Sequence, residues 1–181
     1  WAVECNHVLG SYAMCGPYHS PLGVFSGTGP TADEKGRAAD VLRKGAEFAR
    51  GANLTLAIEY LNRFECYFLT TAADARALVE SVGHPNFRTM YDTFHAHIEE
   101  KSQAAAIQTV APVMAHVHIS ENDRGTPGTG QVRWDEAFRA LKEVGYDGWL
   151  VIEAFGRALP ELAAATRVWR DLFPNPEQVY E

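Results

Sequence analysis

The sequence predicts an α/β fold on a parallel sheet, and three observations favour part of a (β/α)8 TIM barrel. Short apolar runs alternate with amphipathic helices along most of the 181 residues, which is typical of parallel α/β proteins. The strand–helix unit recurs with a period of about 30 residues. Polar side chains stand at the ends of successive strands, where barrels carry their active sites. A complete barrel needs about 250 residues, so we expect about five βα units. Length alone would favour a small doubly wound sheet, but the polar positions favour the partial barrel instead.

The first part of the chain shows the clearest local signals. A strand is expected near Tyr12–Cys15, before the loop Gly16–Pro30. A helix begins after Thr31, where Thr31 and Glu34 fit a capping box, and ends at Gly51. Helical spacing of apolar residues predicts its buried face as Ala38, Val41, Leu42, Ala46 and Ala49.

The alternation then continues to the end of the chain. Further strands are predicted at Leu54–Glu59, Phe87–Asp92, Val113–His118 and Gly148–Ala154. Further helices are predicted at Ala72–Val82, Ser102–Val110, Trp134–Val144 and Leu159–Leu172. The loop 120–131 carries glycines and a proline and is expected to be irregular. No segment has the composition of a linker, so residues 1–181 are expected to form one domain.

Four of the predicted strands end in a side chain that can bind a metal ion: Glu59, Asp92, His118 and Glu153. One such residue is more often a solvated or paired group. Three carboxylates brought together are costly unless a cation offsets them, so four in succession predict one metal site. Strand parity puts His116 on the same face as His118, and we interpret His116 as an inward histidine satisfied by hydrogen bonds.

The predicted ligands consist of three carboxylates and one imidazole. Such an oxygen-rich set suits Mn²⁺, Mg²⁺ or Co²⁺ better than a structural zinc, and Mn²⁺ is the ion we expect. Four ligands leave two positions of an octahedron open, where adjacent oxygens of a sugar would fit. Glu65, His95 and Arg124 follow the strand ends and form a second layer of polar groups.

The composition of the chain limits the classes of partner that it is expected to bind. A net charge of −7 argues against nucleic acid, which requires clustered Lys and Arg. No apolar run approaches the roughly 20 residues of a membrane span, so no membrane partner is expected. Cys5, Cys15 and Cys66 lack CxxC spacing and are interpreted as reduced thiols of a cytoplasmic protein. The chain begins at Trp1 without an initiator Met, which suggests a segment of a longer protein.

A specific combination of motifs lies between residues 12 and 155. Its parts are Leu56–Glu65, Asp92–His95, His116–His118 with Arg124, Pro127–Gly130, and Tyr146–Gly148 running into Glu153. The combination resembles the ketose 3-epimerase family, whose best-known members are the D-tagatose and D-psicose 3-epimerases. That family lies within the xylose isomerase-like TIM barrels.

The resemblance implies a metal-dependent isomerase of carbohydrate metabolism. It would invert C3 of a ketose of the tagatose, fructose or psicose type through a cis-enediolate. Glu59, Asp92, His118 and Glu153 match the metal ligands of the family, and Glu59 and Glu153 match its acid/base pair. Glu65, His95 and Arg124 match side chains that hold the ketose near O1 to O3.

The chain also departs from the family pattern. In the family the metal-binding strands are the last four of eight, whereas only one strand precedes Glu59 here. The resemblance therefore implies the C-terminal part of a barrel, whose unpaired sheet edges favour aggregation. We expect a homo-oligomer, or a missing barrel half supplied by another chain. The loop Gly16–Gly29, with Tyr18, His19 and Phe25, is expected to form part of the sugar pocket.

Other functions remain open on the sequence. A hydroxypyruvate-type aldose–ketose isomerase would use the same ligands, although the segment ending at Glu65 and the pair His118 and Arg124 favour epimerisation. A non-catalytic metal- or sugar-binding module is the second alternative. An endonuclease of this scaffold is a distant third, since it would need more histidine ligands and less acidic charge. The preferred ketose, its phosphorylation and the native ion stay undetermined.

Overall fold

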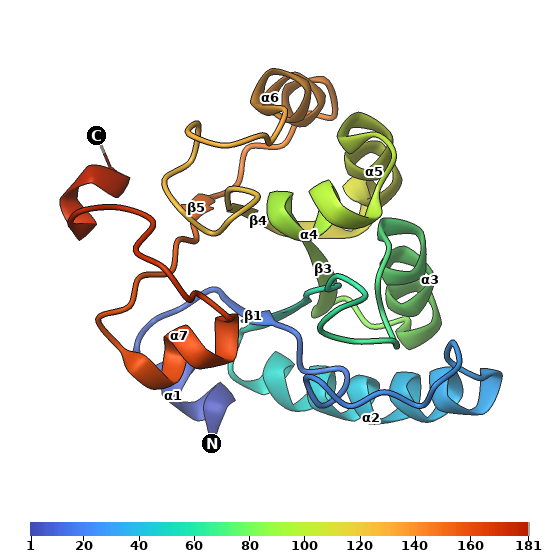
Figure 1. Cartoon of the computed structure of the whole chain (residues 1–181). Coiled ribbons are helices and arrows are strands. Elements are labelled where there is room, and N and C mark those ends of the chain that lie inside the picture. The colour runs from blue at the N-terminus through green and yellow to red at the C-terminus, as the bar shows by residue number, and fades with distance from the viewer. Residues whose placement is uncertain (181) are drawn as a thin grey trace.

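A computed structural model describes residues 1–180 and has an open parallel sheet with helices along its outer side (Figure 1). The strands are β1 (Ala13–Gly16), β2 (Thr55–Ile58), β3 (Phe87–Asp92), β4 (Met114–Ile119) and β5 (Leu150–Ile152). They pair in the order β1-β2-β3-β4-β5, and every pair is parallel. A doubly wound sheet would reverse its strand order at a switch point. Since this order never reverses, the expectation of a partial barrel with five parallel strands is confirmed.

The longer helices surround the sheet as an arc (Figure 1). They are α2 (Ala32–Gly51), α3 (Ala72–Val82), α5 (Gln103–Val110) and α6 (Trp134–Glu143). Each packs against the next one in the arc. The shorter elements are α1 (Ala2–Val8), α4 (Thr93–Glu99), α7 (Pro160–Thr166) and two 3-10 turns at Ala111–Val113 and Pro176–Val179. This order of strand, helix and neighbouring strand is that of successive βα units.

Helix α2 begins as the sequence predicts. The N–H of Glu34 donates to Thr31 Oγ1 at 3.2 Å, and the N–H of Thr31 donates to the Glu34 carboxylate at 2.7 Å. The prediction of its buried face is wrong at Val41, which is 66% exposed. The buried stripe runs through Ala39, Leu42, Ala46 and Ala49, a strict 3-4-3 spacing that leaves Val41 outside it.

The two faces of the sheet have different roles. Leu56 and Ile58 of β2 belong to the apolar core beneath the helices. The intervening Ala57 points to the opposite, inner face, because successive side chains of a strand alternate. At the carboxyl end of β4, Val117 and Ile119 belong to the core, which leaves His118 between them on the inner face. The parity argument from the sequence is therefore correct: the helices cover one face, and the polar strand-end groups occupy the other.

The sequence prediction is least accurate after β4. The strand expected at Gly148–Ala154 is limited to β5, Leu150–Ile152. The helix expected to reach Leu172 ends at Thr166, because Arg167 has a left-handed backbone with φ of 58°. Two short helices, α1 and α4, were not expected. Helix α4 follows β3 at once, with Asp92 as both the last strand residue and the N-cap.

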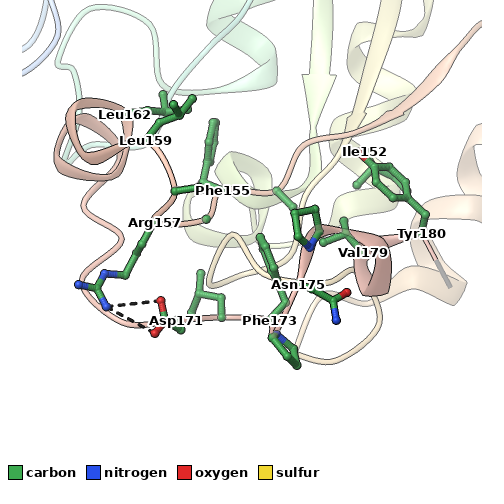
Figure 2. A pocket seen from close by; sticks show the side chains of 16 residues that line it. Ile152, Phe155, Arg157, Leu159, Leu162, Asp171, Phe173, Asn175, Val179 and Tyr180 are labelled. Atoms are coloured by element: carbon green, nitrogen blue, oxygen red, sulfur yellow. Dashed lines mark hydrogen bonds and ion pairs between the residues drawn. The ribbon is translucent and has the colours of Figure 1, made fainter.

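Strands β1 and β5 form the two edges of the sheet, and each pairs with a single strand among residues 1–180. In β5, Leu150, Val151 and Ile152 are 45%, 38% and 38% exposed. Beside this strand lies a cavity of about 720 Å³ between α7 and the segment 171–180 (Figure 2). Unpaired backbone and apolar side chains therefore lie together at one edge. No helix in the described part of the chain is long and apolar enough to cross a membrane.

We expect the isolated 181-residue chain to self-associate through these edges, because unpaired strands with exposed apolar side chains recruit further strands. Sedimentation velocity over a range of protein concentrations measures this directly. Val151→Lys should shift the distribution toward the monomer, since charge on an edge strand opposes pairing. Wild-type chain that sediments as a monomer at every concentration and unfolds cooperatively would contradict the expectation.

Candidate metal centre

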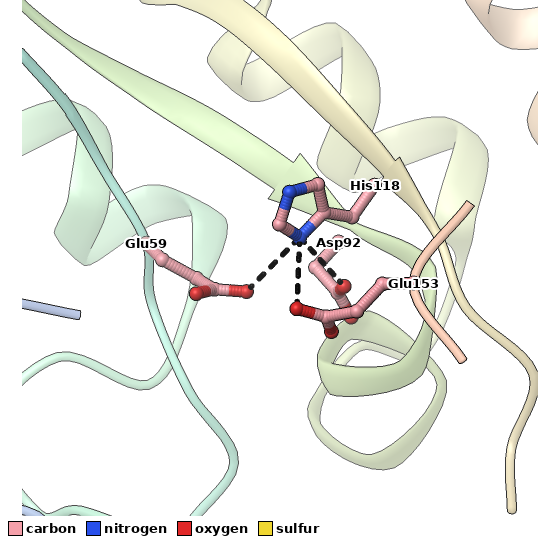
Figure 3. A group of neighbouring side chains, drawn as sticks. All are labelled: Glu59, Asp92, His118 and Glu153. Carbon is pink, nitrogen blue, oxygen red and sulfur yellow. Dashed lines mark ion pairs between the residues drawn. The ribbon is translucent and has the colours of Figure 1, made fainter. Parts of the chain in front are cut away.

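Four side chains converge at the carboxyl ends of the strands (Figure 3). Glu59 directly follows β2, Asp92 ends β3, His118 lies in β4 and Glu153 directly follows β5. Asp92 pairs in register with His118, which places these two side by side. His118 Nδ1 lies 3.8 Å from Glu59 Oε1, 3.7 Å from Asp92 Oδ2 and 3.3 Å from Glu153 Oε1. One ligand atom from each of the four residues lies within 4.8 Å of the other three.

The unsatisfied hydrogen-bonding groups of this cluster are consistent with a bound cation. Glu59 and Asp92 are only 5% and 1% exposed. Glu59 Oε1, Asp92 Oδ2 and His118 Nδ1 are buried and have no hydrogen-bond partner. Unpaired buried polar atoms are strongly unfavourable, and a divalent cation at their centre would satisfy all three at once. Three carboxylates with one imidazole are the ligands that a hard divalent ion prefers.

The pKa values show the electrostatic cost of the cluster without a cation. Burial, followed by the charges of Asp92 and Glu153, raises the pKa of Glu59 well above its usual range. Burial likewise raises the pKa of Asp92 to about 6. Burial acts in the same direction on Glu153, but its close contacts with His118 and Arg124 outweigh it and leave its pKa lowered. The carboxylates therefore repel each other unless positive charge is supplied.

A hydroxyl pair holds the strand ends together, and the sequence analysis missed both members. Thr93 Oγ1 donates to the Ser120 carbonyl at 2.7 Å and accepts from the Ser120 N–H at 2.8 Å. Ser120 Oγ donates in turn to the Glu153 carbonyl at 2.8 Å. These bonds join the ends of β3, β4 and β5, from which three of the four converging side chains project. Isolated Ser and Thr residues after strands give no signal that would have identified them.

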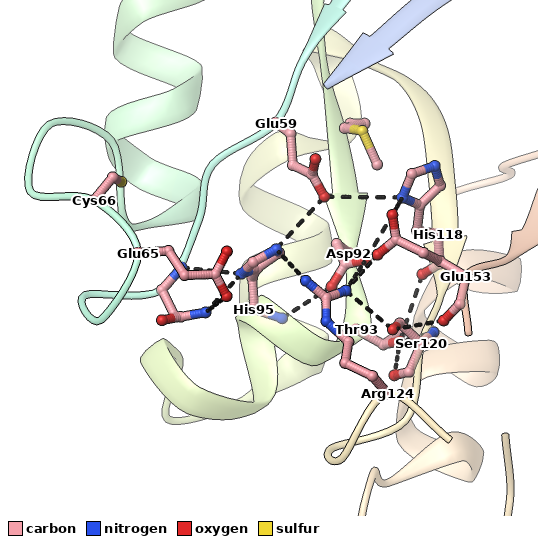
Figure 4. Close-up of polar contacts among 12 residues, drawn as sticks. Glu59, Glu65, Cys66, Asp92, Thr93, His95, His118, Ser120, Arg124 and Glu153 are labelled. Atoms are coloured by element: carbon pink, nitrogen blue, oxygen red, sulfur yellow. Dashed lines mark hydrogen bonds and ion pairs between the residues drawn. The ribbon is translucent and has the colours of Figure 1, made fainter. Parts of the chain in front are cut away.

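The three residues expected to contact a sugar lie beside the cluster (Figure 4). His95 is buried, and its Nε2 lies 3.6 Å from Glu59 Oε1. Arg124 contacts Glu153 through Nη1, and its Nη2 lies 3.2 Å from His95 Nε2. Glu65 is half-buried and reaches this group through Asn62, whose Nδ2 donates to Glu65 Oε1 at 2.8 Å. The structure thus brings all three sequence-predicted residues into one continuous polar network with Glu59 and Glu153.

Arg124 owes its position to an irregular backbone. Its φ of 68° lies in the left-handed region, which is unusual for a residue with a side chain. The guanidinium carbon lies 3.7 Å from the centre of the Phe94 ring and 5.2 Å from that of Phe155. Stacking on aromatic rings and the ion pair with Glu153 together hold the guanidinium in the site.

Glu121 organises the loop that carries Arg124, and the sequence analysis missed it. Its fully buried side chain accepts from the N–H groups of Asn122, Gly128 and Val132 at 2.8–2.9 Å, and from Trp134 Nε1 at 3.1 Å. A Cβ at Gly130 would lie 2.7 Å from this carboxyl group and closer still to Asn122 Oδ1, so a larger residue there would displace both side chains.

Other residues singled out in the sequence have structural neighbours of their own. His116 Nδ1 forms a 2.8 Å hydrogen bond with the hydroxyl of Tyr12, as expected for an inward histidine that is satisfied by hydrogen bonds. In the loop after β1, His19 stacks on Phe68, with ring centres 5.7 Å apart, and Phe25 is exposed.

Comparison with known proteins gives a consistent result. A family model described as xylose isomerase-like TIM barrel matches residues 2–172. A probable ketose 3-epimerase of Synechocystis sp. is 35% identical over 176 residues, which cover 97% of this chain and 61% of the relative. A D-psicose 3-epimerase of Agrobacterium fabrum is 39% identical over 141 residues, covering 78% of this chain and 49% of the relative.

Solved structures agree with the sequence matches. The structure of an L-ribulose 3-epimerase superimposes with a TM-score of 0.90 at 35% identity. This superposition covers 96% of the present chain and 59% of the other. The chain therefore spans about half to three fifths of the length of the relatives it matches, in line with a sheet of five strands where a complete barrel has eight.

We expect Asp92→Asn to weaken Mn²⁺ binding measured by isothermal titration calorimetry. Changes to groups behind a metal ligand cost roughly 10- to 100-fold in affinity, so loss of a direct ligand should cost at least about 100-fold. His7→Gln removes an exposed histidine remote from the cluster and serves as the control. Unchanged Mn²⁺ affinity in Asp92→Asn would exclude this residue as a ligand.

We expect Glu121→Gln to lower the free energy of unfolding by about 1–3 kcal/mol, because buried N–H groups lose a charged acceptor. Burial acts to raise the pKa of Glu121, but its four N–H donors outweigh that effect and lower the pKa below the usual range of a glutamate. A carboxyl group whose pKa is lower in the folded than in the unfolded state stabilises the folded protein at pH values above the unfolded-state pKa. This contribution is lost as the pH falls through the folded-state pKa. Urea titrations should therefore show the variant converging on the wild type below about pH 4.

Asp135→Asn is the matched control for this experiment, because Asp135 lies on the exposed surface of α6. It should leave both the stability and its pH dependence close to those of the wild type. A difference between Glu121→Gln and wild type that stays constant from neutral to acid pH would show that ionised Glu121 is not what stabilises the loop.

Proposed function

The chain belongs to the xylose isomerase-like TIM barrel family, and from this premise we propose that it supplies the catalytic site of a metal-dependent ketose 3-epimerase. The observation that carries the proposal is the convergence of Glu59, Asp92, His118 and Glu153, within 4.8 Å of one another at the strand ends. Relatives named ketose 3-epimerase, D-psicose 3-epimerase and L-ribulose 3-epimerase support the substrate class.

The four converging residues would hold one divalent cation, for which we propose Mn²⁺. The orphaned atoms Glu59 Oε1, Asp92 Oδ2 and His118 Nδ1 support this assignment. When bound, such a cation supplies electrostatic stabilisation of the negative charge that develops on neighbouring substrate oxygens.

Glu59 and Glu153 are proposed as the acid/base pair. Glu59 follows β2 and Glu153 follows β5, with β3 and β4 between them. A ketose held between the two carboxyl groups is proposed to present opposite faces of C3 to them. The ionised glutamate removes the C3 proton, the electron pair of the C3–H bond forms the C2–C3 double bond of a cis-enediolate, and the π pair of the C2 carbonyl moves onto O2. The other glutamate, in its protonated form, then delivers its proton to the opposite face of C3. The configuration of C3 is inverted, and the reverse reaction exchanges the two roles.

Glu65, His95 and Arg124 are proposed to bind the hydroxyl and carbonyl oxygens of the ketose. Their side chains offer an acceptor, an imidazole and a cationic donor next to the acid/base pair. The charge and rigid stacking of Arg124 suit it to orienting an oxygen-rich ligand. Location in the cytoplasm is proposed as well, and the three free cysteines, Cys5, Cys15 and Cys66, support it.

An aldose–ketose isomerase on the same scaffold is the alternative reaction. It would use the same metal ligands but would move hydrogen between C1 and C2. Incubation of the Mn²⁺-loaded chain with D-fructose in deuterium oxide separates the two reactions. Formation of D-psicose with deuterium at C3 supports the epimerase, whereas deuterium at C1 or C2 would support the isomerase.

Replacement of each glutamate tests the proposed roles. We expect Glu59→Gln and Glu153→Gln each to lower the rate of C3 epimerisation by about 10²–10⁴-fold, the usual contribution of a general acid or base. Chiral chromatography of the sugar products measures the rate, and calorimetry with Mn²⁺ establishes whether the metal remains bound. Variants that retain wild-type turnover would refute the acid/base assignment. Metal and sugar binding without turnover in the wild-type chain would instead indicate a non-catalytic module.

A further inference from the structure

Asn62 lies beside the proposed sugar-binding residues, on the side away from the carboxylates of the candidate metal centre, and is not itself one of them. It is almost completely buried, four residues after the end of β2. Its side chain and backbone together contact two of the residues proposed to bind the ketose, Glu65 and His95. A buried amide with this many polar neighbours constrains each of them.

The orientation of the Asn62 amide follows from its neighbours. The N–H of Phe64 donates to Asn62 Oδ1 at 3.0 Å. A backbone N–H is always a donor, so this contact identifies the amide oxygen. The amide nitrogen Nδ2 must then point the other way, where it donates to Glu65 Oε1 at 2.8 Å and lies 3.1 Å from His95 Nδ1.

The same residue determines which nitrogen of His95 carries the proton. The backbone N–H of Asn62 donates to His95 Nδ1 at 3.0 Å. Two donors from Asn62 therefore face Nδ1, and a nitrogen that accepts hydrogen bonds cannot itself be protonated. A neutral imidazole then carries its proton on Nε2.

The surroundings of Nε2 contain one competing donor and one acceptor. Arg124 Nη2 lies 3.2 Å away and would favour an unprotonated Nε2. Glu59 Oε1 lies 3.6 Å away and favours a proton there. Two donors face Nδ1 and only one faces Nε2, so the balance favours a proton on Nε2. The single donor at Nε2 is the guanidinium of Arg124, which also has Glu153 as a partner.

We propose that Asn62 is a positioning residue that holds His95 as its Nε2-protonated tautomer and holds the Glu65 carboxylate beside it. His95 then presents an N–H donor and Glu65 an acceptor. A hydroxyl group both donates and accepts, so this pair recognises a hydroxyl of the bound ketose. The recognition step rests on the proposed function, whereas the tautomer of His95 does not.

Selective ¹⁵N-histidine labelling of the full chain tests the tautomer. In the Mg²⁺-loaded chain, long-range ¹H–¹⁵N correlation spectra distinguish a protonated from an unprotonated ring nitrogen. The His95 signals are identified by their loss in His95→Gln. We expect Nε2 protonated and Nδ1 unprotonated at neutral pH. A proton on Nδ1 in the wild-type chain would overturn the proposal without any variant having to fold.

Asn62→Ala tests the positioning role, with Asn86→Ala as the matched control. Asn86 is a partly buried amide that donates to the Leu54 carbonyl at 3.0 Å near the opposite end of β2 and β3. We expect Asn62→Ala to populate both tautomers of His95 and to weaken D-fructose binding about tenfold, the effect of a lost buried hydrogen bond. Its Mn²⁺ affinity should stay within about twofold of the wild type.

The control separates positioning from general destabilisation. Asn86→Ala should lower the midpoint of thermal unfolding while leaving the His95 tautomer and D-fructose binding as in the wild type. The proposal fails if Asn62→Ala and Asn86→Ala give the same His95 spectrum. If the wild-type chain binds no D-fructose but shows the expected tautomer, the proposed function fails and the positioning of His95 by Asn62 stands.

Discussion

The mutual repulsion of three carboxylates around one imidazole, with two of the carboxylates buried, is the constraint on which the rest of this structure depends. Glu59 and Asp92 are almost inaccessible to water, and neither has a hydrogen-bond partner for the oxygen that faces the others. Such an arrangement is stable only with compensating positive charge, which a divalent cation and Arg124 would share. The surrounding architecture keeps these groups together against that repulsion.

Several layers of structure provide this restraint. Parallel pairing in unbroken order brings the carboxyl ends of neighbouring strands to one edge, so residues distant in sequence meet there. The hydroxyls of Thr93 and Ser120 then join the ends of β3, β4 and β5. Glu121 closes the loop that carries Arg124 over the site. Each contact lies behind the converging groups, where it can resist movement without occupying the space a substrate would need.

The strengths and errors of sequence-based prediction have local physical causes. The capping box at Thr31 and Glu34 was predictable because its partners lie within one helical turn. The buried face of α2 was harder to predict, since Val41 and Leu42 are both apolar and only packing against the sheet selects which of them is buried. Helix α7 is shorter than its pattern suggests, because a left-handed residue at Arg167 ends it. Asn62, Ser120 and Glu121 act through partners up to 33 positions away, which no local pattern reveals.

The sequence by itself determined the class of fold and the chemistry at the strand ends, because periodicity and residue type are local properties. Alternating strands and helices predicted the parallel sheet, and strand parity predicted that the four polar side chains share one face. Only the tertiary structure decided that their ligand atoms lie within 4.8 Å of one another, and that Asn62 links Glu65 to His95. Distances of this kind depend on strand register and loop closure, which arise from contacts between residues far apart in the chain.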